Sequence, residues 1–253
     1  MPVVGYQSIN VTNGFNMISL SFQPVDGSEE IAIQDLIPDT TQLIAGNTAG
    51  LSDRIQVWDG TQFTTYFYRA KKTTNPKFLI GPCWVESNNS GVKTTHTVKH
   101  GSGIWFARPE SAPAQAQITI SGAVNALPFT HDVNPGFNMI ASAFPVDVPL
   151  NTMQVGDVTQ TCPIDWAACG AVAGNTAGLS DRIQIWDGSQ FTTYFYRAKK
   201  TTNPKFTLGP CWVESNNSGV KTPHIIPAGK GFWYARPDDK AAGTLIQTSP
   251  IAK

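Results

Sequence analysis

An internal repeat constrains this chain more than any other feature of its sequence. Residues 45–96 align with residues 173–224 at an offset of 128, and only five of these 52 positions differ. Upstream, the segment GFNMI occurs at residues 14–18 and again at residues 136–140. Downstream, GIWFARP at residues 103–109 matches GFWYARP at residues 231–237. Self-similarity on this scale indicates one structural unit used twice. We therefore expect two tandem homologous domains, at residues 1–123 and 124–253.

The second repeat carries an insertion. The offset between the repeats grows from 122 to 128 residues across it, and the extra residues fall where Cys162 and Cys169 lie. These two cysteines are candidates for a local disulfide, which would imply an oxidising compartment. Cys83 and Cys211 occupy equivalent positions, and the first repeat holds no second cysteine. We expect both of them to be buried free thiols.

Short apolar and aromatic segments predict an all-β fold. Residues 54–58 and 61–69 flank Asp59-Gly60, which predicts a hairpin with a tight type I′ turn, and residues 182–197 repeat the pattern. Further short strands are expected at residues 7–11, 17–22, 84–86, 103–107 and 117–121, with one helical turn at residues 31–36. This spacing favours two β-sandwich or barrel-like domains. No linker rich in Gly, Ser or Pro separates them, so we expect them to be held close together.

Composition and motifs argue against several classes of function. The formal net charge is zero and only 14% of residues are charged, whereas a nucleic-acid-binding protein needs a basic excess. No run of about 18 apolar residues exists, so we expect no membrane insertion. Neither a Gly-x-Ser-x-Gly nor a His-Glu-x-x-His motif is present. The oxygen donors Glu86, Asn88 and Asn89 fit a turn better than a calcium loop. We expect a protein without catalytic residues, metal or cofactor.

The start of the chain and its polar composition bear on location. It opens MPVVGY, with no basic segment followed by an apolar one, so no signal peptide is visible. The chain is nevertheless rich in Thr, Asn, Gly and Ser, which is typical of exported β proteins. We expect a secreted or cell-surface protein.

Aromatic and basic residues that recur in both repeats are the candidates for binding or interface positions. In the segment 62–69, Phe63 and Phe67 point to one side of the predicted strand and Tyr66 and Tyr68 to the other. These rings either fill a core and pack on a neighbour, or form an exposed platform for sugars or for protein. The basic loops 69–77 and 197–205 are either solvated or dock on an acidic surface, including that of another chain. The candidate residues are Trp58, Tyr66, Tyr68, Trp84, Lys71 and Lys72 in the first repeat and Trp186, Tyr194, Tyr196, Trp212, Lys199 and Lys200 in the second.

Four segments carry a family resemblance: residues 14–18 (GFNMI), 52–60 (SDRIQVWDG), 64–68 (TTYFY) and 101–108 (GSGIWFAR). Together they resemble uncharacterised secreted β-domain proteins of the planctomycete–verrucomicrobial group of bacteria. The resemblance covers most of each repeat, although the Cys162–Cys169 insertion departs from it. Its motifs are structural, so it implies export and a surface role and transfers no activity or binding residue.

Two functions follow from these expectations. The first is an extracellular structural protein, a subunit that associates head-to-tail with copies of itself in a filament or surface layer. Residues 2–9 can supply an edge strand to a neighbour in such an assembly. The alternative is a carbohydrate-binding module whose two equivalent aromatic sites bind a polysaccharide with avidity. Recent duplication by itself also explains the near-identity of the repeats.

Overall fold

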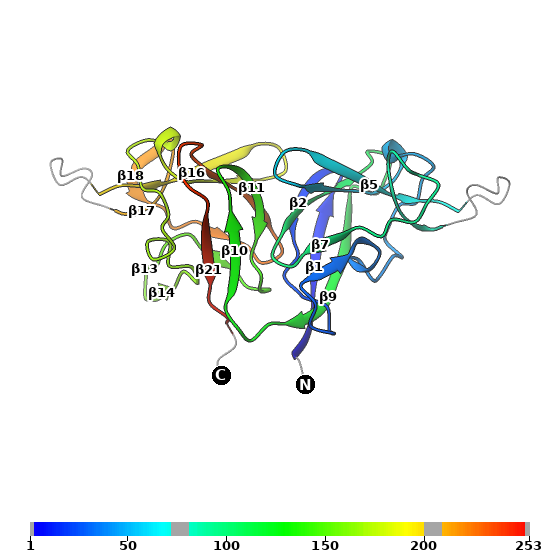
Figure 1. Cartoon of the computed structure of the whole chain (residues 1–253), viewed down its shortest axis with the longest axis horizontal. Coiled ribbons are helices and arrows are strands. Elements are labelled where there is room, and N and C mark those ends of the chain that lie inside the picture. The colour runs from blue at the N-terminus through cyan, green and yellow to red at the C-terminus, as the bar shows by residue number, and fades with distance from the viewer. Residues whose placement is uncertain (1–2, 72–80, 200–208, 251–253) are drawn as a thin grey trace.

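The computed structural model describes residues 3–71, 81–199 and 209–250. The predicted all-β class is confirmed, since the described elements are strands and short 3-10 turns. Figure 1 shows the two repeats side by side along the long axis, with the start of β1 and the end of β21 both at the lower middle of the view. In the first repeat the strands are β1 (Val3–Thr12), β2 (Gly14–Ser19), β3 (Glu30–Ala32), β4 (Arg54–Trp58), β5 (Phe63–Arg69), β6 (Cys83–Glu86), β7 (Thr97–Lys99), β8 (Gly103–Arg108) and β9 (Gln115–Val124).

In the first repeat the main sheet has five antiparallel strands in the order β2-β8-β4-β5-β6. β3 pairs with β7, and β1 forms a ribbon with β9 through ten residue pairs, from Val3 with Val124 to Thr12 with Gln115. Because β1 pairs with β9, the repeat begins and ends in the same ribbon. β9 stops one residue beyond the boundary expected from the sequence.

The second repeat follows the same plan, with its main sheet in the order β11-β20-β15-β16-β17-β18. The insertion forms a hairpin from β13 and β14, and a turn at residues 165–170 follows it. Here too the first strand, β10, pairs with the last, β21. The strands are β10 (Phe129–Val133), β11 (Gly136–Ala141), β12 (Val148–Pro149), β13 (Met153–Val155), β14 (Val158–Gln160), β15 (Arg182–Trp186), β16 (Phe191–Arg197), β17 (Cys211–Glu214), β18 (Asn217–Lys221), β19 (Ile225–Ile226), β20 (Gly231–Arg236) and β21 (Gly243–Gln247).

Each repeat has a hydrophobic core of its own. In the first, alternate residues of β4 and β5, such as Ile55, Tyr66 and Tyr68, point into one core with Trp84. Phe67 points to the other face and packs with Cys83 and Val85. The second repeat has an equivalent core around Tyr194, Tyr196 and Trp212. The alternation predicted for residues 62–69 is therefore present.

Two local predictions have different outcomes. The helical turn expected at residues 31–36 is a 3-10 turn at Ile33–Asp35. The prediction of a type I′ turn at Asp59-Gly60 is wrong. Trp58 pairs with Phe63, so the loop between the strands has four residues. Only Gly60 has a positive φ, of 105°, whereas a type I′ turn needs two such residues. Instead, the Asp59 carboxylate accepts hydrogen bonds from the amides of Thr61 and Gln62, at 2.7 and 2.8 Å, and holds the loop.

Candidate functional site

The two repeats meet in an aromatic contact, which we call the junction. Its centre is a buried cluster of Met17 and Trp105 from the first repeat and Met139 and Trp233 from the second. Trp58 and Trp186 pack on this cluster as partly buried neighbours. β2 and β8 thereby contact β11 and β20, which lie near the centre of the molecule in Figure 1. Two of the candidate residues, Trp58 and Trp186, thus lie in an interface inside the chain.

The contacts of the junction occur twice, with the roles of the repeats exchanged. The indole N–H of Trp58 donates to the carbonyl O of Phe137, and that of Trp186 donates to the carbonyl O of Phe15, both at 2.9 Å. The Trp58 ring meets Trp233 edge-on with centroids 5.5 Å apart, and Trp105 meets Trp186 at 5.9 Å.

The backbone repeats this symmetry. The amide of Ser19 donates to Gly229 O at 3.0 Å, and the amide of its equivalent Ala141 donates to Gly101 O at 2.9 Å. A contact in which the same patch is used on both sides is isologous and closes on itself. The junction therefore does not supply the open-ended contact that a filament repeats, and association between chains needs another surface.

The other candidate aromatics lie inside the repeats. All six are at most 6% exposed, so they form core rather than a platform for sugar rings: Tyr66, Tyr68, Trp84, Tyr194, Tyr196 and Trp212. An aromatic side chain in such a position contributes its large apolar area to packing. Two equivalent exposed aromatic sites, as a carbohydrate-binding module would need, are not formed by these residues.

The candidate lysines divide between described and undescribed parts of the chain. Lys71 and Lys199 are exposed, and each lies two residues after the end of its strand, β5 or β16. Lys72 and Lys200 lie outside the described residues, as does most of each predicted basic loop. Both described lysines are free to meet an acidic surface, which is consistent with either interpretation of these loops.

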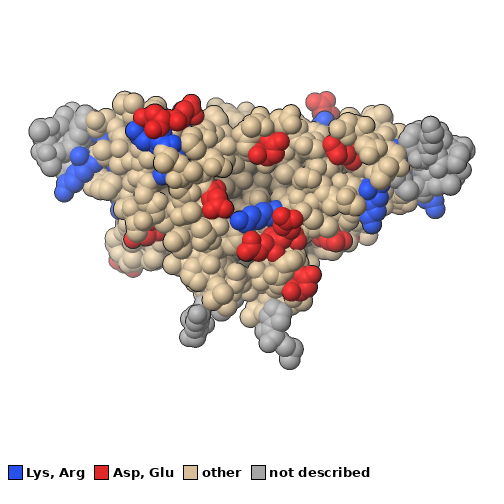
Figure 2. All heavy atoms as spheres, in the orientation of Figure 1, with Lys and Arg blue, Asp and Glu red and all other residues tan. Residues whose placement is uncertain are grey.

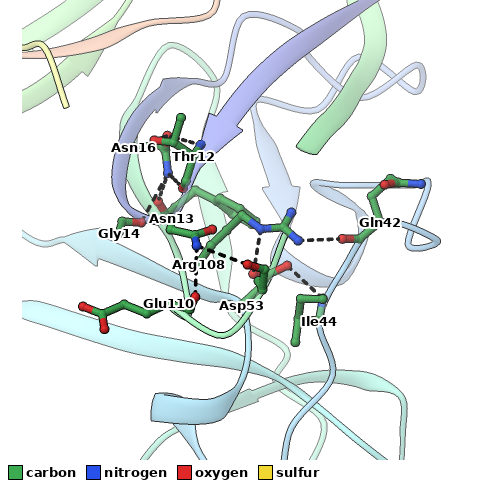
Figure 3. Close-up of polar contacts among 11 residues, drawn as sticks. Thr12, Asn13, Gly14, Asn16, Gln42, Ile44, Asp53, Arg108 and Glu110 are labelled. Carbon is green, nitrogen blue, oxygen red and sulfur yellow. Dashed lines mark hydrogen bonds and ion pairs between the residues drawn. The ribbon is translucent and has the colours of Figure 1, made fainter. Parts of the chain in front are cut away.

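A buried carboxylate–guanidinium pair fixes the long loop before β4 in each repeat. In the first repeat Asp53 Oδ2 accepts a hydrogen bond from the Ile44 amide at 2.9 Å, and Asp53 Oδ1 lies 3.8 Å from Arg108 Nε (Figure 3). Both side chains are almost fully buried. Burial raises the pKa of Asp53 to about 6, against the opposing effects of the Ile44 amide and Arg108. The pair orders the loop and has no opening to substrate.

The second repeat completes the same pair with one more hydrogen bond. Asp181 lies 3.5 Å from Arg236 Nε, and its Oδ2 also accepts a hydrogen bond from the hydroxyl of Tyr234. The first repeat has Phe106 at the position of Tyr234. Burial raises the pKa of Asp181, and the Tyr234 hydroxyl opposes that rise.

Replacing Tyr234 by phenylalanine tests the value of this extra bond. The change leaves Asp181 in the state that Asp53 already has, and we expect the free energy of unfolding to fall by about 1–3 kcal/mol. Urea denaturation of the variant and of Tyr6→Phe, an exposed control, measures the difference. Equal stability of the two variants would show that the hydroxyl contributes nothing net.

The four cysteines are free thiols, so the predicted disulfide between Cys162 and Cys169 is not formed. The Cys169 sulfur instead accepts a hydrogen bond from the Ile246 amide at 3.1 Å, and both side chains pack on the second core. Burial raises the pKa of Cys162 to about 11, so its thiol is protonated and unreactive. Free thiols at Cys162 and Cys169 do not call for an oxidising compartment. Cys83 and Cys211 are buried thiols, as predicted.

β1 presents an exposed edge with apolar side chains. Within the described part of the chain β1 pairs only with β9, which leaves its other edge without a strand. Val3, Val4 and Tyr6 are 56%, 61% and 77% exposed, while Ile9 and Val11 further along the same strand are buried. An unpaired edge of this kind is a template for pairing with another chain. No charged residue lies between Val3 and Thr12 to block such pairing.

The surface around this edge is acidic. Asp26, Glu30 and Asp35 line a hollow beside Val4 and Val25. Figure 2 shows carboxylates grouped over the lower part of the first repeat and basic side chains near both outer ends of the molecule. The chain as a whole has zero net charge, so its acidic surface near β1 is balanced by basic side chains elsewhere on the molecule.

Within residues 3–71, 81–199 and 209–250, no group of three or more His, Cys, Asp or Glu side chains is placed to hold a metal ion. None of the helical segments in these ranges is long and apolar enough to cross a membrane. Glu86, Asn88 and Asn89 form a turn in which the Asn89 amide donates to Glu86 O at 3.0 Å.

Comparison of the chain with protein-family models, with curated proteins and with solved structures gave no match. The resemblance to secreted planctomycete–verrucomicrobial proteins therefore stays a prediction.

Proposed function

We propose that this protein is a non-enzymatic structural subunit that associates with other copies of itself through the open edge of β1. The observation that carries the proposal is this edge, with its exposed Val3, Val4 and Tyr6 and its unpaired backbone. Backbone hydrogen bonds to a neighbouring strand supply affinity in such contacts, and alternate side chains supply specificity. We place the assembly outside the cell, in a filament or surface layer, in keeping with the composition of the chain.

The position of β1 favours pairing of its free edge with another chain over pairing with a strand of the same chain. The junction already uses the aromatic surface that the repeats share, and it closes on itself. β1 belongs to only one repeat, and its equivalent β10 has five residues in place of ten. Only the first repeat has the long edge strand, so the surface at one end of the contact differs from any surface that the second repeat offers. That asymmetry suits a head-to-tail contact.

A charge on β1 tests the proposal. In Tyr6→Lys and Val4→Lys the exposed face of the strand carries a cation, and we expect self-association to weaken about tenfold or more. Val158→Lys is the matched control, because Val158 is 66% exposed on β14 in the other repeat. Sedimentation velocity over a range of concentrations, with electron microscopy of the concentrated samples, gives the result.

Two outcomes contradict the proposal. If the unmodified chain stays monomeric at every concentration and forms no ordered assembly, self-association is not its role. If it assembles and the two β1 variants assemble as well as Val158→Lys does, another surface makes the contact. Deleting residues 2–9 is a poor substitute for these variants, because it removes Ile9 from the core and most of the pairing with β9.

A further inference from the structure

The junction is asymmetric at one place, where a pair of histidines has no counterpart at the symmetry-equivalent position. His100 follows β7 in the first repeat and His131 lies in β10 of the second, and both are nearly fully buried. Both imidazoles meet the ring of Phe129 edge-on, with ring centroids 4.8 Å apart in each contact. At the equivalent place on the other side, Ala228 stands for His100 and Ile9 for His131. The titratable pair is thus specific to one side.

We propose that the junction is acid-sensitive and that protonation of His100 and His131 opens the contact between the two repeats. The pair ties the repeats together directly. The Nε2–H of His100 donates to the carbonyl O of Ala143 at 2.7 Å, which is a bond from the first repeat to the second. Close by, the hydroxyl of Ser21 donates to Ser142 O at 2.9 Å. Opening the junction breaks both bonds.

Packing leaves little room for the pair to adapt. A Cβ on Gly101 would lie 2.6 Å from the Phe129 ring and 3.0 Å from the His131 ring, so these rings rest on bare backbone. Two cations that both contact Phe129 repel each other, as the lowering of the His131 pKa by His100 indicates, and burial withholds the water that would solvate them. Opening relieves both costs because it exposes the two imidazoles to water, which reaches the groove of about 330 Å³ beside them in the closed state.

The charged groups near the pair do not cancel this effect. Burial lowers the pKa of His131 to about 4 from 6.5, and His100 and Lys99 lower it further while the Gln247 amide and Asp132 oppose them. Burial also lowers the pKa of His100, against the Ala143 and Ser21 carbonyls and Glu29. Lys99 and Asp132 form an ion pair with each other at 3.7 Å across the groove, and both are well exposed.

The direction of the pH dependence follows from these shifts. A histidine whose pKa is lower in the closed state than in the open state binds its proton better when the junction is open. The closed junction is therefore fully favoured above pH 6.5, the pKa of an exposed histidine, and is weakened progressively as the pH falls toward 4. Protonation of His131 alone shifts the equilibrium toward the open state on the order of 100-fold.

Amide hydrogen exchange on the full chain measures this opening at individual bonds. The amides of Ser19 and Ala141 donate across the junction, whereas those of Ser87 and Ser215 donate to carbonyls of their own repeat. After correction for intrinsic rates, we expect the protection of Ser19 and Ala141 to fall on the order of 100-fold between about pH 7.5 and pH 4. The protection of Ser87 and Ser215 should change only a few-fold.

Matched variants separate the histidine pair from other effects of acid. The double variant His100→Ala/His131→Ile installs the residues found on the other side of the junction, and we expect its Ser19 and Ala141 amides to stay protected in acid. His96→Ala/His224→Ala is the control, because each of these histidines contacts a tyrosine of its own repeat, and it should behave as the unmodified chain.

Several results would overturn the proposal. The first is that junction and control amides of the unmodified chain lose protection in acid to the same extent. The second is that the His100→Ala/His131→Ile variant is as acid-sensitive as the unmodified chain. If that variant does not fold at neutral pH, NMR titration of the unmodified chain decides the matter. Imidazole midpoints for His100 and His131 below 6.5 that track the exchange of Ser19 support the proposal. Midpoints at or above that value refute it.

Discussion

Replacing Arg108 by methionine should lower the free energy of unfolding by about 3–5 kcal/mol at neutral pH, because it leaves the buried carboxylate of Asp53 without its counter-ion. The two side chains are 2% and 0% exposed, so water cannot take over the role of the guanidinium. Arg236→Met in the second repeat should cost less, since Asp181 keeps the hydroxyl of Tyr234. Urea denaturation of both variants gives the two costs.

The cost of Arg108→Met should shrink in acid. Asp53 has a folded-state pKa of about 6, above its ordinary value of 3.8, and the loss of Arg108 raises it further. A carboxyl with a raised folded-state pKa binds its proton more tightly when folded, so stability increases as the pH falls from that pKa toward 3.8. Lys240→Met, which breaks an exposed ion pair with Asp239, is the control and should cost less than about 1 kcal/mol. A cost for Arg108→Met as small as this control would contradict the assignment.

Replacing Trp233 by alanine should be as damaging, at about 3–5 kcal/mol, because it empties the centre of the junction. Trp233 is 9% exposed, and its ring lies within 6.0 Å of those of Trp58, Phe63 and Phe137. Trp105→Ala is the mirror-image change and should have a similar cost. Thermal and urea unfolding, followed by tryptophan fluorescence, measures both.

The symmetry of the junction makes a second measurement possible. Trp105 and Trp233 belong to one cluster, so the double variant should cost less than the two single costs combined, since neighbouring changes couple. Tyr6→Ala serves as a control because Tyr6 is 77% exposed, and it should stay within about 0.5 kcal/mol. Simple additivity in the double variant would mean that the two tryptophans do not share a core.

Much of the fold could be read from local pattern. The strands at residues 54–69 were predictable because apolar and aromatic side chains alternate on both sides of a turn, and their pairing is local in sequence. The pairing of β1 with β9 could not be read in this way, because its partners lie more than 100 residues apart. The type I′ turn failed for a local reason, since the Asp59 carboxylate binds two loop amides and stabilises a longer loop.

The candidate site was less predictable than the fold. A recurring aromatic residue looks the same in the sequence whether it fills a core or a surface, and Trp58 and Trp84 illustrate the two cases. Trp84 fills the core of its own repeat, while Trp58 reaches across to the second repeat. The histidine pair was missed because His100 and His131 have no sequence relation to each other. The only available signal was that neither histidine recurs in the other repeat, which has Ala228 in place of His100 and Ile9 in place of His131.

The sequence by itself therefore determined that this chain is all-β and built on one repeated unit. Both properties are expressed in the order and spacing of neighbouring residues. Only the tertiary structure decided which face of each strand is buried, that the repeats meet through an isologous junction, and that β1 keeps an open edge. Those outcomes depend on strand pairing and side-chain packing between residues far apart in the chain. Whether a side chain is buried is decided by the residues that pack against it in the folded protein.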